Sequence, residues 1–178
     1  MNLQDFKKRV NSDLVGKVIN IASRSASFVV KKYGKQLSAN CIEKSLYDEF
    51  VDSGFDIAKN YEARNFSQAM RLIMKLADKA NQYIDEKKPW QLAKIEGKEK
   101  EVHEITSLSI NLFKVLMTYL KPVLPEMARR SEEFLNVESL NWSDIEYPLT
   151  SHKINKFKPL MTRIEDDQIE QMVESSKA

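Results

Sequence analysis

Apolar residues recur at intervals of three and four along most of this chain, which is the spacing of amphipathic helices. Over residues 5–33 the pattern predicts one long helix that bends near Gly16 and ends at Gly34, since glycine favours a helix end. A second helix is expected over residues 42–61, with Gly54 as the place for a bend. The pattern thus predicts two helices in this first part of the chain.

The same spacing predicts four more helices, separated in part by prolines. They are expected over residues 67–88, 102–119, 127–135 and 166–175. Pro89 follows the first of these, and Pro122 and Pro125 follow the second, because proline interrupts a helix. Residues 136–159 show mixed periodicity, so we expect a loop with at most short helical pieces.

Composition supports a helical fold. The 178 residues include only four glycines and five prolines, too few for the tight turns of a many-stranded sheet. We therefore predict one all-α domain over residues 1–178, an antiparallel helix bundle of about five main helices. The single cysteine, Cys41, excludes an internal disulfide framework and a multi-cysteine zinc site, which fits a reducing cytoplasm.

Charge and hydropathy limit the classes of partner. No run of about 18 apolar residues occurs, and the N-terminal residues carry charges, so we predict a soluble chain with no membrane span or signal peptide. The net charge of +2 is too small for a general nucleic-acid-binding surface. Contact with nucleic acid would have to be local, for example at the lysine pairs 31–32 and 87–88. The alternative is that these lysines serve solubility.

Patterns that would indicate catalysis are missing from the sequence. His103 and His152 lie far apart in the chain, and no helical pair of histidines with metal-ligand spacing occurs. The sequence also lacks a glycine-rich phosphate loop and a Gly-x-Ser-x-Gly nucleophile motif. We therefore assign no catalytic and no metal-binding residue, and an independent enzyme is not expected.

A tryptophan at a predicted helix break is the first candidate for binding. Trp90 directly follows Pro89, and the preceding helix carries Asp78, Asn81 and Asp85 at intervals of three and four, so they form one polar stripe leading to the indole. An exposed indole at such a corner can stack on an unpaired base. The alternative is that Trp90 packs the elbow between two helices and the stripe is a solvated face.

Asn20 and Arg24 form a second polar group, one turn apart in an otherwise apolar helix. An amide can accept a hydrogen bond from an exocyclic amine of a base, while a guanidinium donates to ring acceptors. Together they could read one base edge. An internal hydrogen bond to a neighbouring helix or a surface salt bridge is the alternative.

Several segments resemble the anticodon-binding domain of bacterial methionyl-tRNA synthetase. They are residues 17–24 (KVINIASR), 77–85 (ADKANQYID), 89–94 (PWQLAK), 116–125 (LMTYLKPVLP) and 152–157 (HKINKF). Their order and approximate spacing agree with the family as well, and the resemblance covers nearly the whole chain. It implies the helical bundle that serves as anticodon-binding domain in related class I synthetases.

The resemblance also implies roles for individual residues. Asn20, Arg24 and Trp90 would contact a CAU anticodon, with Trp90, after Pro89, stacking on its first base, cytosine. Three polar family positions that would help to discriminate against other anticodons correspond to Asp78, Asn81 and Asp85. Arg163 resembles a basic position near the anticodon stem or near the coupling to the catalytic part.

The catalytic signatures of the family are missing from this sequence. It contains no His-Ile-Gly-His-like or Lys-Met-Ser-Lys-Ser-like motif and no cysteine-ligated zinc knuckle. By resemblance, ATP and zinc belong to the full-length enzyme. We expect a C-terminal fragment or isolated domain that binds tRNA with a CAU anticodon, pairs with the catalytic domain of the same enzyme, and does not activate methionine by itself. A free-standing tRNA-binding protein and an interaction scaffold with no RNA preference remain the alternatives.

Overall fold

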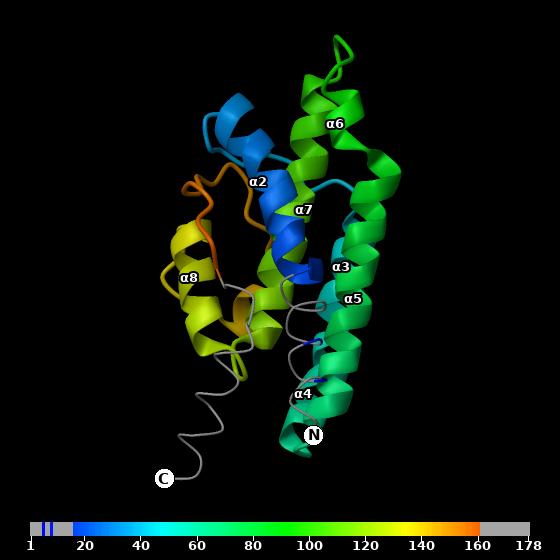
Figure 1. Cartoon of the computed structure of the whole chain (residues 1–178), viewed down its shortest axis with the longest axis vertical. Coiled ribbons are helices and arrows are strands. Elements are labelled where there is room, and N and C mark those ends of the chain that lie inside the picture. Colours follow the sequence, from blue (N-terminus) through cyan, green and yellow to red (C-terminus); the bar gives the residue numbers. More distant parts are fainter. Residues whose placement is uncertain (1–4, 6–7, 9–15, 161–178) are drawn as a thin grey trace.

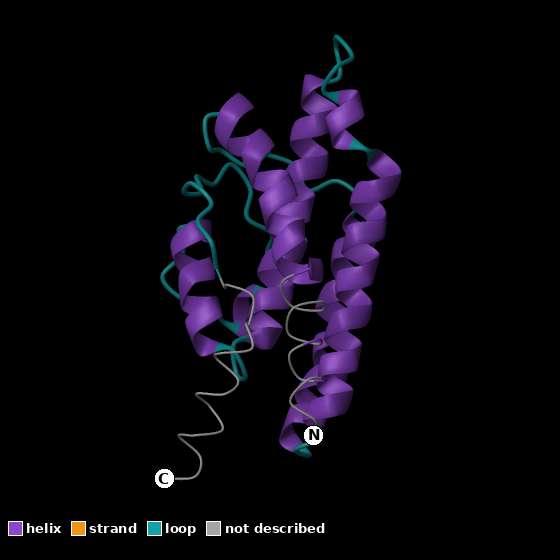
Figure 2. Ribbon diagram, viewed as in Figure 1, coloured by secondary structure: helices purple, strands orange, loops and turns teal. Residues whose placement is uncertain are grey.

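The computed structural model describes Asp5, Lys8 and residues 16–160, and within this part the fold is built from helices (Figures 1 and 2). A π-helical turn over residues 16–19 leads into α2. The helices are α2 (Asn20–Lys32), α3 (Lys44–Asp52), α4 (Gly54–Glu62), α5 (Phe66–Lys87), α6 (Pro89–Leu92), α7 (Glu99–Leu120) and α8 (Pro125–Leu135), followed by the 3-10 turn η2 (Trp142–Asp144). No strand occurs between residues 16 and 160, where one isolated bridge pairs Gln36 with Lys153. The all-α prediction is confirmed.

Proline and glycine set the helix boundaries largely as the sequence predicts. Pro89 separates α5 from α6, and α7 ends before Pro122. The predicted helix over residues 127–135 begins two residues earlier because Pro125 occupies its first turn, where a missing amide proton has no cost. Gly34 has a φ of 59°, the left-handed conformation that terminates α2. The predicted bend near Gly16 coincides with the π-helical turn.

The helix expected over residues 42–61, with a bend at Gly54, begins at Lys44 and divides at Ser53 into α3 and α4, next to the predicted bend. The Tyr119 hydroxyl donates to the carbonyl of Phe50 at 2.7 Å and approaches that of Val51 at 3.1 Å. A continuous helix would use these two carbonyls for its own ladder, so the hydroxyl interrupts it. Gly54 permits this approach, since a Cβ there would lie 2.7 Å from the hydroxyl.

The long helix α7 is the centre of the bundle. It packs against α2, α3, α5 and α8, and every residue from Ile105 to Leu120 is buried (Figure 1). Burial on all sides explains why its sequence is apolar around most of its circumference. The helices α2 and α5 contact both α7 and each other, which brings two distant polar segments of the sequence side by side. None of the described helices is both long and apolar enough to span a membrane.

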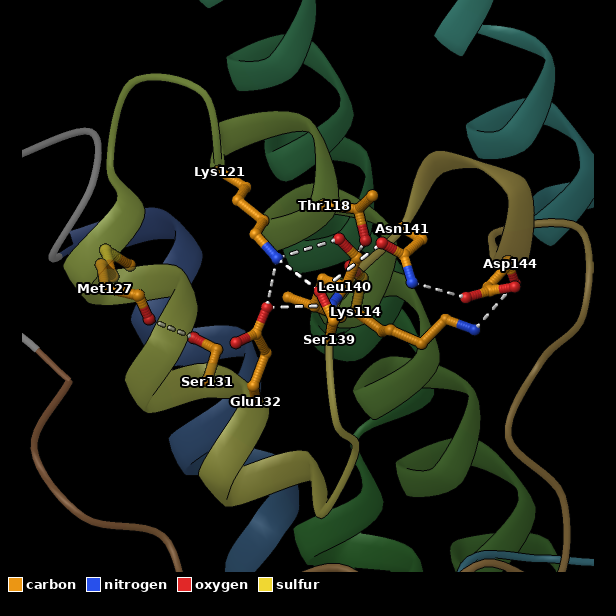
Figure 3. A network of polar contacts seen from close by, with 10 residues as sticks. All are labelled: Lys114, Thr118, Lys121, Met127, Ser131, Glu132, Ser139, Leu140, Asn141 and Asp144. Carbon is orange, nitrogen blue, oxygen red and sulfur yellow. Dashed lines mark hydrogen bonds and ion pairs between the residues drawn. The ribbon is translucent and has the colours of Figure 1, made fainter.

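Two lysines anchor the long segment after α8 (Figure 3). Lys121 Nζ lies 2.6 Å from Glu132 Oε1, and the same carboxylate oxygen accepts the amide of Leu140 at 2.9 Å. Deeper in the fold, Lys114 donates to the carbonyls of Tyr147 at 2.6 Å and Asp144 at 3.3 Å. Burial lowers the pKa of Lys114 to about 8. The segment thus forms the expected loop with one short helical piece, while the helix predicted over 166–175 lies outside the described residues.

Candidate nucleic-acid interface

The polar stripe of α5 is paired with the first helical segment across the contact between α2 and α5. Lys17 Nζ lies 3.0 Å from Asp78 Oδ1, and Arg24 Nη2 lies 2.8 Å from Asp85 Oδ1. Seven residues, or two helical turns, separate the pairs on each segment. Since the pairs follow in the same order along the chain, α2 and α5 run parallel to each other.

Asn81 lies between the two ion pairs and ties the helices together. Its side-chain amide donates to the Lys17 carbonyl at 3.0 Å and to the Ala77 carbonyl at 3.0 Å. The stripe therefore does share one face, as predicted, and that face is turned toward the α2 segment. The side chains of Asp78 and Asp85 are nevertheless 60% and 62% exposed, so water and other polar groups still reach both carboxylates.

Asn20 begins α2 directly after the π-helical turn. Its Nδ2 donates to the Gly16 carbonyl at 2.6 Å, and the residue is exposed. This bond engages the amide nitrogen and not Oδ1, which is the acceptor atom of the side chain. The bond fixes the orientation of the amide by holding its donor end against the backbone. Irregular turns of this kind are frequent at functional sites.

The corner between α5 and α6 determines the position of Trp90. Lys88 adopts the left-handed conformation, with φ 48° and ψ 60°, and redirects the chain between the two helices. Pro89 is buried at the start of α6, whereas Trp90 is 37% exposed. The indole thus packs partly against the elbow and partly faces solvent, and each of the two interpretations of the sequence describes part of its environment.

Arg24 links the two predicted groups. Its guanidinium carbon lies 4.9 Å from the centroid of the Trp90 ring, within the range of a cation–π contact, while Nη2 binds Asp85. The structure therefore brings together Arg24, Asp85 and Trp90, with Asn20 one turn before Arg24 on α2. Arg163, the remaining predicted site residue, lies outside the described residues.

Lys17 joins the group through Asp78, although it was not among the predicted site residues. It was visible as a cation on the same helix face as Arg24, but its relation to Asp78 depends on how α2 and α5 are aligned. Within the described residues, no three His, Cys, Asp or Glu side chains are placed to hold a metal ion.

The groups of the candidate interface are accessible at the surface, since Trp90 is 37% exposed and the side chain of Arg24 is 35% exposed. One hollow of about 540 Å³ lies elsewhere, between α7 and the segment after α8, where Lys114 and Tyr147 contribute to its lining. By contrast, Trp90, Arg24 and Asn20 present a partly exposed ring, a guanidinium and an amide. Stacking and edge hydrogen bonds from such groups are the usual means of recognising unpaired RNA bases.

The described residues thus form a helical domain with a partly exposed group of one aromatic ring, one guanidinium and one carboxylate on its surface. A family model described as the anticodon binding domain of methionyl tRNA ligase matches residues 34–176, and the chain belongs to this family. Asp78, Asn81, Asp85, Pro89 and Trp90 lie inside the matched range. Asn20 and Arg24 precede it.

Two methionine–tRNA ligases are similar to this chain over nearly its whole length, including the residues before the range of the family model. The methionine–tRNA ligase of Vesicomyosocius okutanii is 65% identical over 177 residues, which cover 99% of this chain and 32% of that ligase. The methionine–tRNA ligase of Psychrobacter cryohalolentis is 57% identical over 178 residues, covering 100% of this chain and 25% of the relative. The chain thus spans about a quarter to a third of the length of these relatives.

Solved structures show the same fold. The free form of Mycobacterium tuberculosis methionyl-tRNA synthetase superposes with a TM-score of 0.85 at 18% identity, covering 93% of this chain and 35% of that one. The complex of the same synthetase with methionyl-adenylate gives a TM-score of 0.80 over 88% of this chain. At this level of identity the likeness extends to the fold alone.

Proposed function

We propose that this chain reads the CAU anticodon of tRNA as the anticodon-binding domain of a cytoplasmic methionine–tRNA ligase. Family membership supports the role in anticodon binding. The single structural observation that carries the proposal is the convergence of Arg24, Asp85 and Trp90 in one partly exposed group, where a base and its edge can be contacted together.

Cytosine, the first base of the anticodon, is the proposed partner of this group. Its exocyclic amine is a donor and its ring nitrogen and carbonyl are acceptors, whereas uracil has an acceptor in place of the amine. Asn20 Oδ1 would accept from the amine, which agrees with the use of Nδ2 in the bond to Gly16. Arg24 would donate to the ring acceptors while Trp90 stacks on the base.

The two carboxylates contribute to selectivity in this proposal. Asp85 holds Arg24 beside the indole, and Asp78 holds Lys17 two turns away. Both carboxylates are more than half exposed, so each would also repel a phosphate group that approached in the wrong register. Weak overall basicity is compatible with such recognition, because the contacts to bases are few and local.

Methionine activation with ATP and transfer to tRNA belong, in this proposal, to the catalytic domain of the ligase. The chain would contribute the anticodon contacts that select the tRNA. Its own sequence has no glycine-rich phosphate loop, so no step of ATP chemistry is assigned to it.

A fluorescence titration tests the proposal. Trp142→Phe leaves Trp90 as the sole tryptophan, because the chain has only two. An RNA stem-loop with a CAU anticodon should quench the emission of this variant, and a UAU loop that differs only in the first anticodon base should bind more weakly. Equal affinities for the two loops would contradict CAU reading. Absence of binding to either loop would support the alternative, a helical interaction scaffold with no RNA preference.

A further inference from the structure

A second ion pair lies next to the corner that carries Trp90. Lys87, the last residue of α5, places Nζ 2.6 Å from Glu43 Oε1 in the loop before α3. The side chains are 38% and 37% exposed, so the contact lies at the surface but is partly shielded. Lys87 belongs to one of the lysine pairs considered above for a local contact to nucleic acid, but neither residue is among the proposed contacts to the anticodon bases.

This ion pair joins two turns that both depend on a left-handed residue. Glu43 itself has φ 47° and ψ 51° where the chain enters α3, and Lys88, next to Lys87, has φ 48° and ψ 60° where it enters α6. Residues other than glycine adopt this conformation at a cost in free energy, which surrounding contacts must offset. The pair is placed to hold both turns at once.

Lys87 also contacts an aromatic ring of its own helix. Its Nζ lies 5.7 Å from the centroid of the Tyr83 ring, one turn earlier on α5. Tyr83 is buried, and its hydroxyl has no hydrogen-bond partner within the described part of the chain. The ring therefore acts here through its face, as a support for the ammonium group.

The direction of α6 follows from this corner. The Lys88 carbonyl accepts the amides of Gln91 at 2.9 Å and Leu92 at 3.1 Å, so the short helix that carries Trp90 is bonded directly to the left-handed residue. A rotation at Lys88 would turn the whole of α6. Arg24 restrains the indole from α2, and the Glu43–Lys87 pair restrains its backbone from the α3 side.

We infer that Glu43 and Lys87 are positioning residues for Trp90, and that their ion pair sets the orientation in which the indole meets an anticodon base. The expected effect of the ion pair on RNA binding rests on the proposed function. The structural part of the inference concerns the free chain and is measurable without RNA.

The test uses the full chain with Trp142→Phe, so that Trp90 is the only fluorescent tryptophan. Lys87→Met removes the charge but keeps the stem, and Glu43→Gln removes the partner. Lys79→Met is the matched control, because Lys79 also pairs from α5 to a glutamate of α3, Glu49, with similar exposure but two turns before the corner. Each variant is measured for emission maximum, acrylamide quenching and affinity for the CAU stem-loop.

Lys87→Met and Glu43→Gln should both shift the emission of the free chain and raise its quenching by acrylamide. Their affinity for the CAU loop should fall about two- to fivefold, the range that corresponds to an exposed ion pair. Lys79→Met should leave the emission, the acrylamide quenching and the affinity for the CAU loop unchanged. Lys87→Arg, and the exchange of charges by Glu43→Lys with Lys87→Glu, should restore the emission of the parent chain.

Unchanged emission and quenching in both Lys87→Met and Glu43→Gln would overturn the inference. An equal change in Lys79→Met would do the same, since it would indicate a general loosening of α5. Failure of the proposed function has a different signature, namely equal affinity of the parent chain for CAU and UAU loops. The free-chain fluorescence would then still decide whether the pair positions Trp90.

Discussion

The guanidinium of Arg24 lies over one face of the Trp90 ring, with its carbon 4.9 Å from the ring centroid. The same group binds Asp85 at 2.8 Å, so it is restrained at two points. One face of the indole is therefore already in contact with a cation. A base that stacks on Trp90 must use the opposite face or move Arg24 toward the edge of the base, and either route makes Arg24 and Trp90 interdependent.

Replacement of the indole tests the stacking role. Trp90→Ala should weaken binding of the CAU loop by about 1–3 kcal/mol, the usual range for one base on an aromatic side chain. Helical content should stay intact, because the ring is more than a third exposed. Binding is measured by fluorescence anisotropy of labelled RNA, and folding by circular dichroism. Loss of the thermal transition would instead identify Trp90 as a core residue.

Asp85→Asn should release Arg24 and remove one negative charge from the surface. We expect all loops to bind about two- to fivefold more tightly, because the local repulsion of phosphates is reduced. Discrimination between CAU and UAU loops should fall, since Arg24 is no longer held beside the indole. Asp56→Asn on α4 is the control for net charge. If that variant gives the same change, the effect of Asp85 is not local.

Asn20 and Arg24 should act as a coupled pair on the first anticodon base. Each alanine variant should lower discrimination between cytosine and uracil, and the double variant should cost less than the sum of the two, as expected for a shared partner. Lys31→Ala should weaken both loops alike and reduce the salt dependence of binding. Equal losses for both loops in the Asn20 and Arg24 variants would indicate a role in the fold or in backbone contacts.

Local patterns in the sequence were sufficient to predict much of the fold. Apolar spacing and the prolines at 89, 122 and 125 located α5, α7 and α8 within a few residues. The alignment of Asp78, Asn81 and Asp85 on one face also follows from helix geometry alone. These features depend on residues within one or two turns of each other, which is why they were accessible without a structure.

Features that depend on packing between helices could not be predicted in this way. Gly54 indicated the place of the bend, but the cause of the break at Ser53 is Tyr119, which is 66 residues further along the chain. The pairing of Arg24 with Asp85 and of Lys17 with Asp78 requires the register of α2 against α5. The spacing within one helix does not determine that register, so the sequence indicated the candidate residues but not their contacts.

The close approach of Gly54 to Tyr119 predicts a loss of stability on substitution. A Cβ at Gly54 would lie 2.7 Å from the hydroxyl oxygen and 3.2 Å from two ring carbons, so Gly54→Ala should reduce the free energy of unfolding by about 1–3 kcal/mol. Urea denaturation measures the change. The loss should be smaller in a Tyr119→Phe background, which lacks the nearest atom. An equal loss in both backgrounds would show that the clash is not the cause.

The lowered pKa of Lys114 leads us to expect that the free energy of unfolding depends on pH in the alkaline range. The side chain is only 5% exposed, and burial lowers its pKa in the folded chain to about 8, below the ordinary lysine value of 10.5. Between these values the unfolded chain binds a proton that the folded chain has released. Stability contributed by this group should therefore rise with pH through this window and be constant below it.

From pH 7.5 to 9.5 the expected gain from Lys114 is about 1–2 kcal/mol in the free energy of unfolding. The measurement stays below pH 10 to avoid the titration of buried tyrosines. Burial raises the pKa of the Tyr61 hydroxyl to about 12, so above pH 10 the unfolded chain loses its tyrosine protons before the folded chain does. That difference lowers the stability and would oppose the gain from Lys114. Urea denaturation of the parent chain and of Lys114→Met isolates the contribution. Lys114→Met cannot titrate, so the difference in stability between the two proteins should change with pH in favour of the parent. A constant difference would show that the ammonium group of Lys114, bonded to the Tyr147 and Asp144 carbonyls, keeps its proton throughout the range.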